Sequence, residues 1–555
     1  MMNLSRARES TNAIKRIYVA MQHLLNRGHY KPMGESGNAL RTALLELRPE
    51  IYGAIAEEKT ELNGLIYVLE RLPEGIEACV HINLTSDEGY AETHLKAIVP
   101  PKRRRNCYRI DPEQMNIEIT RGRSDVYDIL THLTFLYWEA DKLQQRAWQA
   151  DTQTFSHDWV KFSALMTLEE RTEADRERAL IHLASMMGRT YTEASALNSN
   201  FATAQDPDRM LSLFYWLIKR STDEHTQGIK RSISFSPLLR ERIGHHIYGE
   251  KWANNIKNTL SEHQLFHRPI HLISANMHSV MNALYAGHAL AEETQGLAPL
   301  ARYELLSAAE NEHLRSQVKA YAQAHGMISI DDTSGTNIDV QVFDMAQCVS
   351  GACAFNSDRD PAQQPVLVVM DYAFGEQAFE TVDEFLKPLN TPEGRAYLNI
   401  VSVSIMGKAG ILAGDKGDLM IPNAHIFEGT ADNYPFENAL STQDFDGHGL
   451  KVFGGPMLSV LGTSLQNKDI LAYFQASSWG VIGLEMEGVH YQKAIQAAAK
   501  IRKNIREDVV VRYAYYASDN PLETGSTLAS GGLGTTGVKP TYLITEKILS
   551  QIFND

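Results

Sequence analysis

The chain has 555 residues and a formal net charge of -15, with 43% hydrophobic and 22% charged residues. Its length exceeds one compact core and predicts two to four domains, at roughly 100–200 residues each. The acidic charge argues against non-specific binding to nucleic acid or to an anionic membrane, and the ordinary composition argues against disorder.

The N-terminal segment carries charges where a signal peptide would need an apolar core, and no later stretch reaches the roughly 18 apolar residues of a spanning helix. Four cysteines in so long a chain do not make a disulfide framework. Cys348 and Cys353 lie close together, but no second pair completes a zinc site, so we interpret them as ordinary cysteines. We therefore expect a cytoplasmic protein with no membrane partner.

Residues 1–325 are predicted to form a mostly helical region of undetermined role, as one or two subdomains. The expected helices span residues 5–26, 38–58, 124–149 and 160–188, and one β segment is expected at 77–84. The basic run KRRR, Lys102 to Arg105, is interpreted as a solvated loop. Histidines gather in residues 245–290, but no HExxH pattern occurs there, and we expect no metal site and no cofactor.

Residues 326–555 change character, because apolar β-rich runs now alternate with helical segments. The expected strands are 365–374, 396–407, 417–428, 450–462, 481–484 and 508–519, and the expected helices are 375–389, 489–504 and 539–553. Strands that alternate with helices predict an α/β domain with a largely parallel sheet.

Carboxylates follow two of these strands at the points where the strands end. Glu485 and Glu487 come directly after the run 481–484, and Gly488 is expected to let the chain turn tightly into the next helix. Asp519 ends the strand one helix later, about the length of a βαβ step. Since α/β proteins bind ligands at the carboxyl ends of their strands, we expect these carboxylates to share a pocket. Taken singly, each has a simpler interpretation as a helix cap or a turn former.

The segments GLEMEGVHY and VVVRYAYYASDNPL together resemble the nucleoside phosphorylase and nucleosidase superfamily. That superfamily, which includes purine nucleoside phosphorylases, methylthioadenosine/S-adenosylhomocysteine nucleosidases and AMP nucleosidase, carries a V-E-M-E-type segment followed by a V-R-x-x-S-D segment. SDNPL is closest to the form found in AMP nucleosidase. The resemblance covers about residues 360–555. It implies a mixed sheet flanked by helices, and a homo-oligomer.

The resemblance also implies roles for individual residues at the sugar and the base. Glu487 would hold the ribose 2′ and 3′ hydroxyls, and Met486 would pack against the sugar, whereas Glu485 would support the strand end or cap the helix. Asp519 would protonate or hydrogen-bond N7 of the purine, with Ser518 and Arg512 supporting it.

Two further segments are assigned by the same resemblance. Gly407 to Gly410 would line the sugar or phosphate pocket, and Glu376 is the nearest candidate for a water-activating base. Lys408 departs from the family's Ser, Thr or Cys, and is either a phosphate-binding cation or a surface lysine. The Gly-rich segment 523–540 is either a lid whose N–H groups reach phosphates or a flexible connection.

Chemistry supports these roles independently of the resemblance. Breaking an N-glycosidic bond builds positive charge on the ribose and negative charge on the leaving purine. A carboxylate at the ribose favours the first, and an acid at N7 relieves the second. A buried strand end would raise the pKa of that acid, as the role requires.

We therefore predict an enzyme that releases the base from a purine nucleoside or nucleotide, with hydrolysis of AMP or another adenine nucleotide favoured. The alternative enzyme is a phosphate-dependent purine nucleoside phosphorylase. The alternative of another class is a nucleotide-sensing module that binds without turnover, with the helical half as its output.

Overall fold

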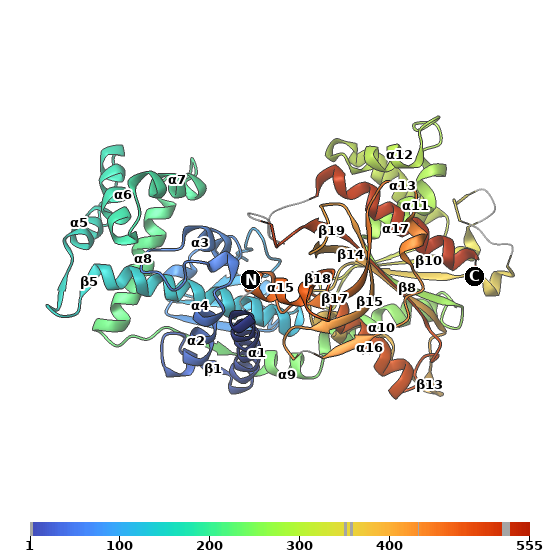
Figure 1. Cartoon of the computed structure of the whole chain (residues 1–555), viewed down its shortest axis with the longest axis horizontal. Coiled ribbons are helices and arrows are strands. Elements are labelled where there is room, and N and C mark those ends of the chain that lie inside the picture. The colour runs from blue at the N-terminus through green and yellow to red at the C-terminus, as the bar shows by residue number, and fades with distance from the viewer. Residues whose placement is uncertain (1–3, 349–351, 356–358, 431, 524–532, 555) are drawn as a thin grey trace.

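The computed structural model describes residues 4–348, 352–355, 359–430, 432–523 and 533–554, and Figure 1 shows its two units side by side. A five-stranded sheet organises the first unit and a ten-stranded sheet the second. Among the described residues, no helix combines the length and apolar content needed to cross a membrane.

The first unit packs helices around a mixed sheet in the order β1-β7-β2-β4-β3. The strands are β1 (His29–Tyr30), β2 (His81–Thr85), β3 (Cys107–Arg109), β4 (Gln114–Glu118) and β7 (Ser232–Phe235). The prediction of one β segment at 77–84 found β2 and missed the other four. These strands are short, and β2 pairs in parallel with β7, which lies far along the chain, so no local pattern announces the sheet.

The helices of this unit follow the predicted ones only in part. They are α1 (Leu4–Arg27), α2 (Asn38–Leu47), α3 (Leu62–Leu69), α4 (Gly122–Ala147), α5 (His157–Met166), α6 (Glu173–Met187), α7 (Tyr191–Phe201), α8 (Arg209–Thr226) and α9 (Pro237–Gly244), with a small hairpin of β5 (Trp148–Gln149) and β6 (Thr154–Phe155). The helix predicted over 160–188 is two helices. Thr172 and Asp175 form a capping box that starts α6 and separates it from α5.

The second unit is a sheet with helices on both faces (Figure 1). Its strands are β8 (Ile270–Ser274), β9 (Met327–Ile330), β10 (Val340–Asp344), β11 (Val366–Met370), β14 (Ile400–Ile411), β15 (Leu419–Phe427), β16 (Asn433–Pro435), β17 (Val452–Ser459), β18 (Gly483–Glu485) and β19 (Val510–Asp519), and β12 (Leu389–Thr391) forms a hairpin with β13 (Gly394–Ala396). Its helices are α10 (Ile247–Glu262), α11 (Met277–Ala289), α12 (Pro299–Ser307), α13 (Glu312–Ala324), α14 (Gln377–Phe385), α15 (Lys468–Ala476), α16 (Gly488–Gln496) and α17 (Val538–Asn554).

Alternating side chains divide the core of this unit between the two faces of the sheet. In β11, Val366 and Val368 pack with α10, α14 and α16, whereas Leu367 and Val369 pack with α11, α13 and α17. Both faces of the central strands are therefore apolar, which explains the nearly continuous hydrophobic runs in their sequence.

The sheet is mixed, so the prediction of a largely parallel one is corrected. Strand β14 runs parallel to β8 and β19 but antiparallel to β18, and β15 joins β19 and β17 to close a ring of five strands. Strand β8 precedes the boundary predicted near residue 325, yet it lies in the middle of this sheet. We therefore expect the two units to divide near residue 245.

The two units share apolar contacts, and this fixes the first unit over one edge of the large sheet. Helix α15 packs against α1, and one continuous buried cluster includes Leu465 and Leu484 together with residues of α1 and α4. Across the junction, the hydroxyl groups of Tyr67 and Thr463 lie 2.9 Å apart.

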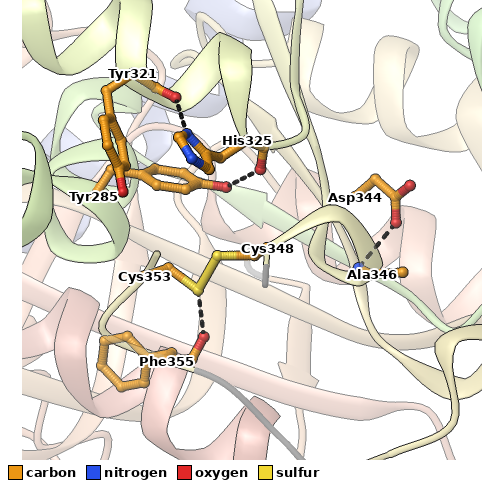
Figure 2. The surroundings of a disulfide bond; sticks show 8 residues. All are labelled: Tyr285, Tyr321, His325, Asp344, Ala346, Cys348, Cys353 and Phe355. Atoms are coloured by element: carbon orange, nitrogen blue, oxygen red, sulfur yellow. Dashed lines mark hydrogen bonds between the residues drawn. A yellow bond between two sulfur atoms is a disulfide. The ribbon is translucent and has the colours of Figure 1, made fainter. Parts of the chain in front are cut away.

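Cys348 and Cys353 form a disulfide, which the sequence did not predict (Figure 2). The Cys353 Sγ lies 3.0 Å from the carbonyl oxygen of Phe355, and both cysteines pack into the cluster under α11 and α17. The other cysteines, Cys79 and Cys107, are buried thiols. The described part of the chain contains no group of three or more His, Cys, Asp or Glu side chains placed to hold a metal ion.

Candidate active site

A cavity of about 480 Å³ lies between the two units, at the edge of the sheet where β14 and β18 meet. The turn from β18 into α16 provides Glu485, Met486 and Glu487, and β14 provides Gly407 and Lys408. Aromatic rings form much of the remaining wall, from Tyr372, Phe374, Tyr491, Tyr515 and Tyr516. The first unit contributes Arg71, Lys102 and Arg103.

Glu487 presents a carboxylate that backbone groups hold in place. Its Oε1 accepts a hydrogen bond of 2.9 Å from the Gly375 N–H, and its Oε2 accepts one of 3.3 Å from the Met486 N–H. Gly375 has φ of +55°, and a Cβ there would lie 2.3 Å from the Ser124 Oγ, so only glycine fits this close approach. Burial, and then the nearby Glu485 carboxylate, raise the pKa of Glu487 to about 8.

Glu485 uses both carboxylate oxygens within the protein. Ser459 donates its hydroxyl hydrogen to Oε1, and the N–H groups of Glu487 and Gly488 donate to Oε2. These are the first N–H groups of the helix that starts here, so the capping alternative describes what Glu485 does in this structure. Burial raises its pKa to about 7.

Gly488 is required for packing, and the expectation of a tight glycine turn is corrected. Its φ is not in the left-handed region. A Cβ on Gly488 would lie 2.3 Å from the His425 ring and 2.8 Å from a Glu485 oxygen. The absence of a side chain therefore lets α16 start against β15.

Asp519 ends β19 beside Gly410 of β14, and its carboxylate is buried with one oxygen unsatisfied. Ser518 donates its hydroxyl hydrogen to Oδ1 at 2.5 Å, whereas Oδ2 has no hydrogen-bond partner among the described residues. Burial raises the pKa of Asp519, and the Lys408 ammonium opposes that rise. Asp519 does not itself line the cavity, but it is close enough to Lys408, which does, to be influenced by its charge.

Asp519 and the two glutamates reach the same edge, but not through the βαβ step that their spacing in the sequence suggested, because a βαβ step would make their two strands parallel neighbours. Strands β18 and β19 are not parallel neighbours, because β14 lies between them. Leu484 and Asp519 each pair with Gly410, on opposite sides, since β18 meets only the last two residues of β14. Gly410 thus separates the two carboxylate-bearing ends, and Gly410 itself does not line the cavity.

Two predicted site residues lie elsewhere. Glu376 is buried against the first unit, where its Oε1 accepts a hydrogen bond of 3.2 Å from the Tyr18 hydroxyl and its N–H donates to the Ser124 Oγ. Arg512 donates from Nε to Gln551 at 2.6 Å and lies seven residues before Asp519, about 23 Å along an extended strand at about 3.3 Å per residue. Neither side chain lines the cavity.

Comparison with known families assigns the chain over almost its whole length. It matches the model described as "Family of unknown function (DUF6909)" over residues 38–304 and 297–554. The chain belongs to the DUF6909 family. No curated protein matches its sequence.

Solved structures similar to this DUF6909 chain include nucleosidases. The methylthioadenosine/S-adenosylhomocysteine nucleosidase of Campylobacter jejuni is 10% identical, with a TM-score of 0.31 over 52% of this chain and 99% of that chain. A mutant futalosine hydrolase of Helicobacter pylori is also 10% identical, with a TM-score of 0.30 over 51% and 99%. The 5′-methylthioadenosine/S-adenosylhomocysteine nucleosidase from S. pneumoniae is 11% identical, with a TM-score of 0.29 over 52% of this chain and 100% of that chain.

The basic residues of the first unit are the part of this DUF6909 site that the sequence did not indicate. The run from Lys102 to Arg105 was expected to be a solvated loop, yet Arg105 is 2% exposed and Lys102 and Arg103 line the cavity. The sequence did contain a signal for these residues, because the four consecutive basic residues precede a helix that carries Asp125 and Asp128. The region predicted as a lid falls mostly on residues 524–532, outside the described residues, and Gly534–Gly537 forms a short 3₁₀ turn before α17.

Proposed function

We propose that this chain cleaves the N-glycosidic bond of a purine nucleoside or nucleotide and releases the free base. The observation that carries the proposal is the Glu487 carboxylate, held by two backbone N–H groups at the edge of a cavity lined by aromatic rings. We favour water as the nucleophile and an adenine nucleotide as the substrate, in line with the SDNPL segment.

The ribose end of the proposed reaction follows from the geometry of Glu487. Two backbone N–H groups occupy only part of the acceptor capacity of a carboxylate, which offers about four lone pairs. The remaining positions accept hydrogen bonds from the two ribose hydroxyls, and the negative charge of the ionised form of Glu487 favours the positive charge that develops on the sugar. Met486 lies next to Glu487 in the cavity wall and packs against the sugar.

The base end is assigned to Asp519 by the resemblance, and this side chain lies beside the cavity, close to Lys408, and not in its lining. A general acid must hold its proton near neutral pH, and burial raises the pKa of this carboxyl group in the required direction. Ser518 satisfies Oδ1, so Oδ2 is left for the purine N7. The aromatic walls offer Tyr372 and Tyr516 as stacking surfaces for a planar base.

Phosphorolysis is the second candidate, and one observation favours it. Cations line the cavity, whereas the expected general base Glu376 is turned toward Tyr18. Phosphate as a nucleophile needs cationic and backbone donors rather than a base. We propose a homo-oligomer in either case, by resemblance to the superfamily.

The test measures released base and sugar product by chromatography. Purified protein is incubated with AMP, adenosine, inosine and guanosine, each with and without inorganic phosphate. Base release without phosphate identifies a hydrolase, and strict phosphate dependence with ribose 1-phosphate formed identifies a phosphorylase. The Glu487→Gln variant must lose release, and Glu173→Gln, whose side chain is 81% exposed on α6, must retain it. Tight nucleotide binding without any released product would show that the protein is a nucleotide-binding module and neither of the two enzymes.

A further inference from the structure

We infer that the first unit supplies an anion site to this cavity, and that the site binds the phosphate of a nucleotide whose ribose lies on Glu487. The inference rests on the proposed function for the sugar end. Residues far in sequence from the catalytic motifs would then select a phosphorylated substrate over a free nucleoside.

The first unit lines this cavity with positive charge. Within the described residues, everything that the first unit contributes to the lining of this cavity is basic, namely Arg71, Lys102 and Arg103. Lys408 of β14 adds a fourth cation from the second unit. A chain with a formal net charge of -15 has thus concentrated positive charge where Glu487 is exposed to a ligand. A wall of cations attracts an anionic phosphate, and it does not repel a nucleoside, which carries no charge.

Arg71 is a buried cation whose guanidinium is not fully hydrogen-bonded. It is 7% exposed, its guanidinium lies 3.4 Å from the centre of the Tyr67 ring, and NH1 donates to the Tyr67 carbonyl at 2.8 Å and lies 3.6 Å from the Glu70 carboxylate. Its Nε has no hydrogen-bond partner in the described part of the chain. Burying an unsatisfied charged donor is costly, so a ligand oxygen at this position would relieve the cost.

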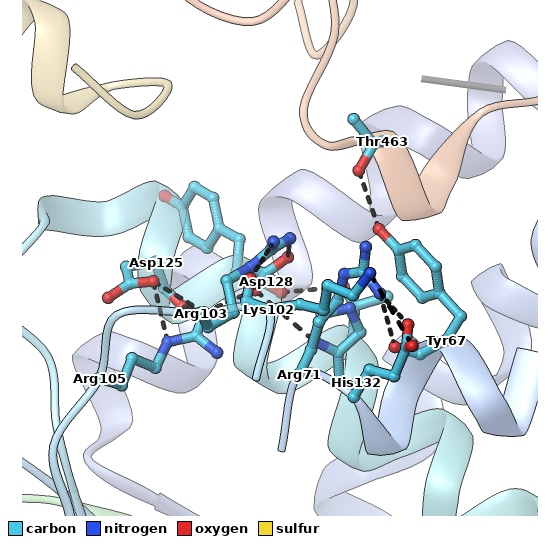
Figure 3. Close-up of polar contacts among 12 residues, drawn as sticks. Tyr67, Arg71, Lys102, Arg103, Arg105, Asp125, Asp128, His132 and Thr463 are labelled. Carbon is cyan, nitrogen blue, oxygen red and sulfur yellow. Dashed lines mark hydrogen bonds and ion pairs between the residues drawn. The ribbon is translucent and has the colours of Figure 1, made fainter. Parts of the chain in front are cut away.

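Ion pairs with carboxylates of α4 hold the basic loop in place (Figure 3). Arg103 makes two hydrogen bonds to Asp128, at 2.9 and 3.0 Å, and Arg105 pairs with Asp125 at 2.7 Å. These contacts fix the loop, and the bidentate pair with Asp128 leaves the charge of Arg103 largely compensated. The neighbouring Lys102 is different, since its ammonium is 3.9 Å from Glu70 and its side chain is 55% exposed. Lys102 and Arg71 are therefore the ligand-binding members, and Arg103 positions the loop.

The space beside the cavity also suits phosphate groups. A second cavity of about 600 Å³ shares Lys102, Arg103 and Phe374 with the first, and it adds Arg104 and Arg121, with Asp371 as its carboxylate. The Arg121 guanidinium lies 4.5 Å from the centre of the Phe374 ring, and its Nε lacks a partner among the described residues. The positively charged region therefore extends beyond the space that one phosphate group would occupy.

Isothermal titration of the full chain with inorganic pyrophosphate, AMP, GMP, adenosine and guanosine tests the inference without depending on turnover. We expect AMP or GMP to bind more tightly than its nucleoside by tenfold or more, because charge-assisted hydrogen bonds to phosphate are the strong ones. Lys102→Glu should weaken nucleotide and pyrophosphate binding by about tenfold or more while nucleoside binding stays the same. Lys230→Ala, at an exposed position of the first unit, is the matched control.

Arg71→Gln is the second variant, with circular dichroism to show that it folds, and Lys102→Arg should restore nucleotide binding. Equal affinities for nucleotide and nucleoside, no binding of any phosphate compound, or nucleotide binding unchanged in both Lys102→Glu and Arg71→Gln, would overturn the inference. Base release from nucleosides with no benefit from a phosphate leaves the proposed function standing and removes the anion site. Charge-dependent nucleotide binding without base release does the reverse.

Discussion

Glu487→Gln is expected to abolish base release and, at alkaline pH, to stabilise the fold. Burial and the Glu485 carboxylate raise the pKa of Glu487 from 4.5 to about 8. A carboxyl group with a raised pKa holds its proton more tightly in the folded state than in the unfolded state. The wild-type protein therefore loses stability as the pH rises from about 4.5 to about 8, and a neutral glutamine is spared that loss.

The magnitude follows from the two pKa values. Their difference of about 3.5 corresponds to about 5 kcal/mol, at about 1.4 kcal/mol per pKa unit. Partial exposure of Glu487 and its coupling to Glu485 reduce this value. In E487Q, an amide group opposite the Met486 N–H lowers the stability of the variant by about 1–2 kcal/mol. We expect the free energy of unfolding of E487Q to exceed that of wild type by about 1–3 kcal/mol at pH 9, and not to exceed it at pH 5.

Urea unfolding of both proteins at pH 5, 7 and 9 measures this difference. Base release by both proteins is measured at pH 8, where about half of the Glu487 groups in the wild type are ionised. E487Q loses the contact between the carboxylate and the positive charge that develops on the sugar in the transition state. This loss should lower the rate of base release by about 100- to 1,000-fold. Glu173→Gln on α6 is the control, and an exposed site should change stability by less than about 0.5 kcal/mol at every pH. A stability difference between E487Q and wild type that stays constant from pH 5 to pH 9 would refute the reasoning.

Three further predictions concern other parts of the molecule. Asp519→Asn should lower base release by roughly 100- to 10,000-fold with the unfolding midpoint retained, and wild-type release should fall as the pH rises above the pKa of Asp519, because only its protonated form is an acid; an alkaline plateau would contradict this role. Gly488→Ala should destabilise the fold by about 1–3 kcal/mol in urea unfolding, since its Cβ would meet the His425 ring, and an unchanged midpoint would show that the ring can move away. Replacing both Cys348 and Cys353 by serine should cost at most about 2 kcal/mol, because the bond closes a short loop, and base release should be unaffected, as neither residue lines the cavity; lost activity in the folded variant would show a coupling between the two places.

Local features of the chain were predictable from the sequence. The turn from Gly483 to Gly488 follows an apolar run and precedes a helical pattern, so the position of its carboxylates at a strand end needed only neighbouring residues. The same holds for Asp519 at the end of β19 and for most helices and strands after residue 360. Hydrophobic periodicity determines such elements because each depends on contacts within a few residues.

Tertiary structure decided which of these side chains can act on a ligand. By local pattern alone the two glutamates of GLEMEGVHY are equivalent, and only the resemblance gave them different roles. In the structure, the Glu485 oxygens accept hydrogen bonds from Ser459 and the start of α16, and only Glu487 keeps acceptor capacity. Glu376 follows a buried strand as a catalytic base would, yet α1 approaches it and its carboxylate meets Tyr18. Hydrogen-bond partners of this kind come from distant segments, and no local pattern reports them.

The basic wall of the cavity depended most on the fold. Arg71 and Lys102 lie more than 300 residues before Glu487 in the chain, and they reach it because α1 packs on α15 and because Asp125 and Asp128 hold the loop that carries Lys102 and Arg103. By itself, the sequence determined the elements and the carboxylates at their ends. The long-range packing of the two units determined that those carboxylates face a cluster of cations, since burial and distance between remote segments are properties of the whole fold.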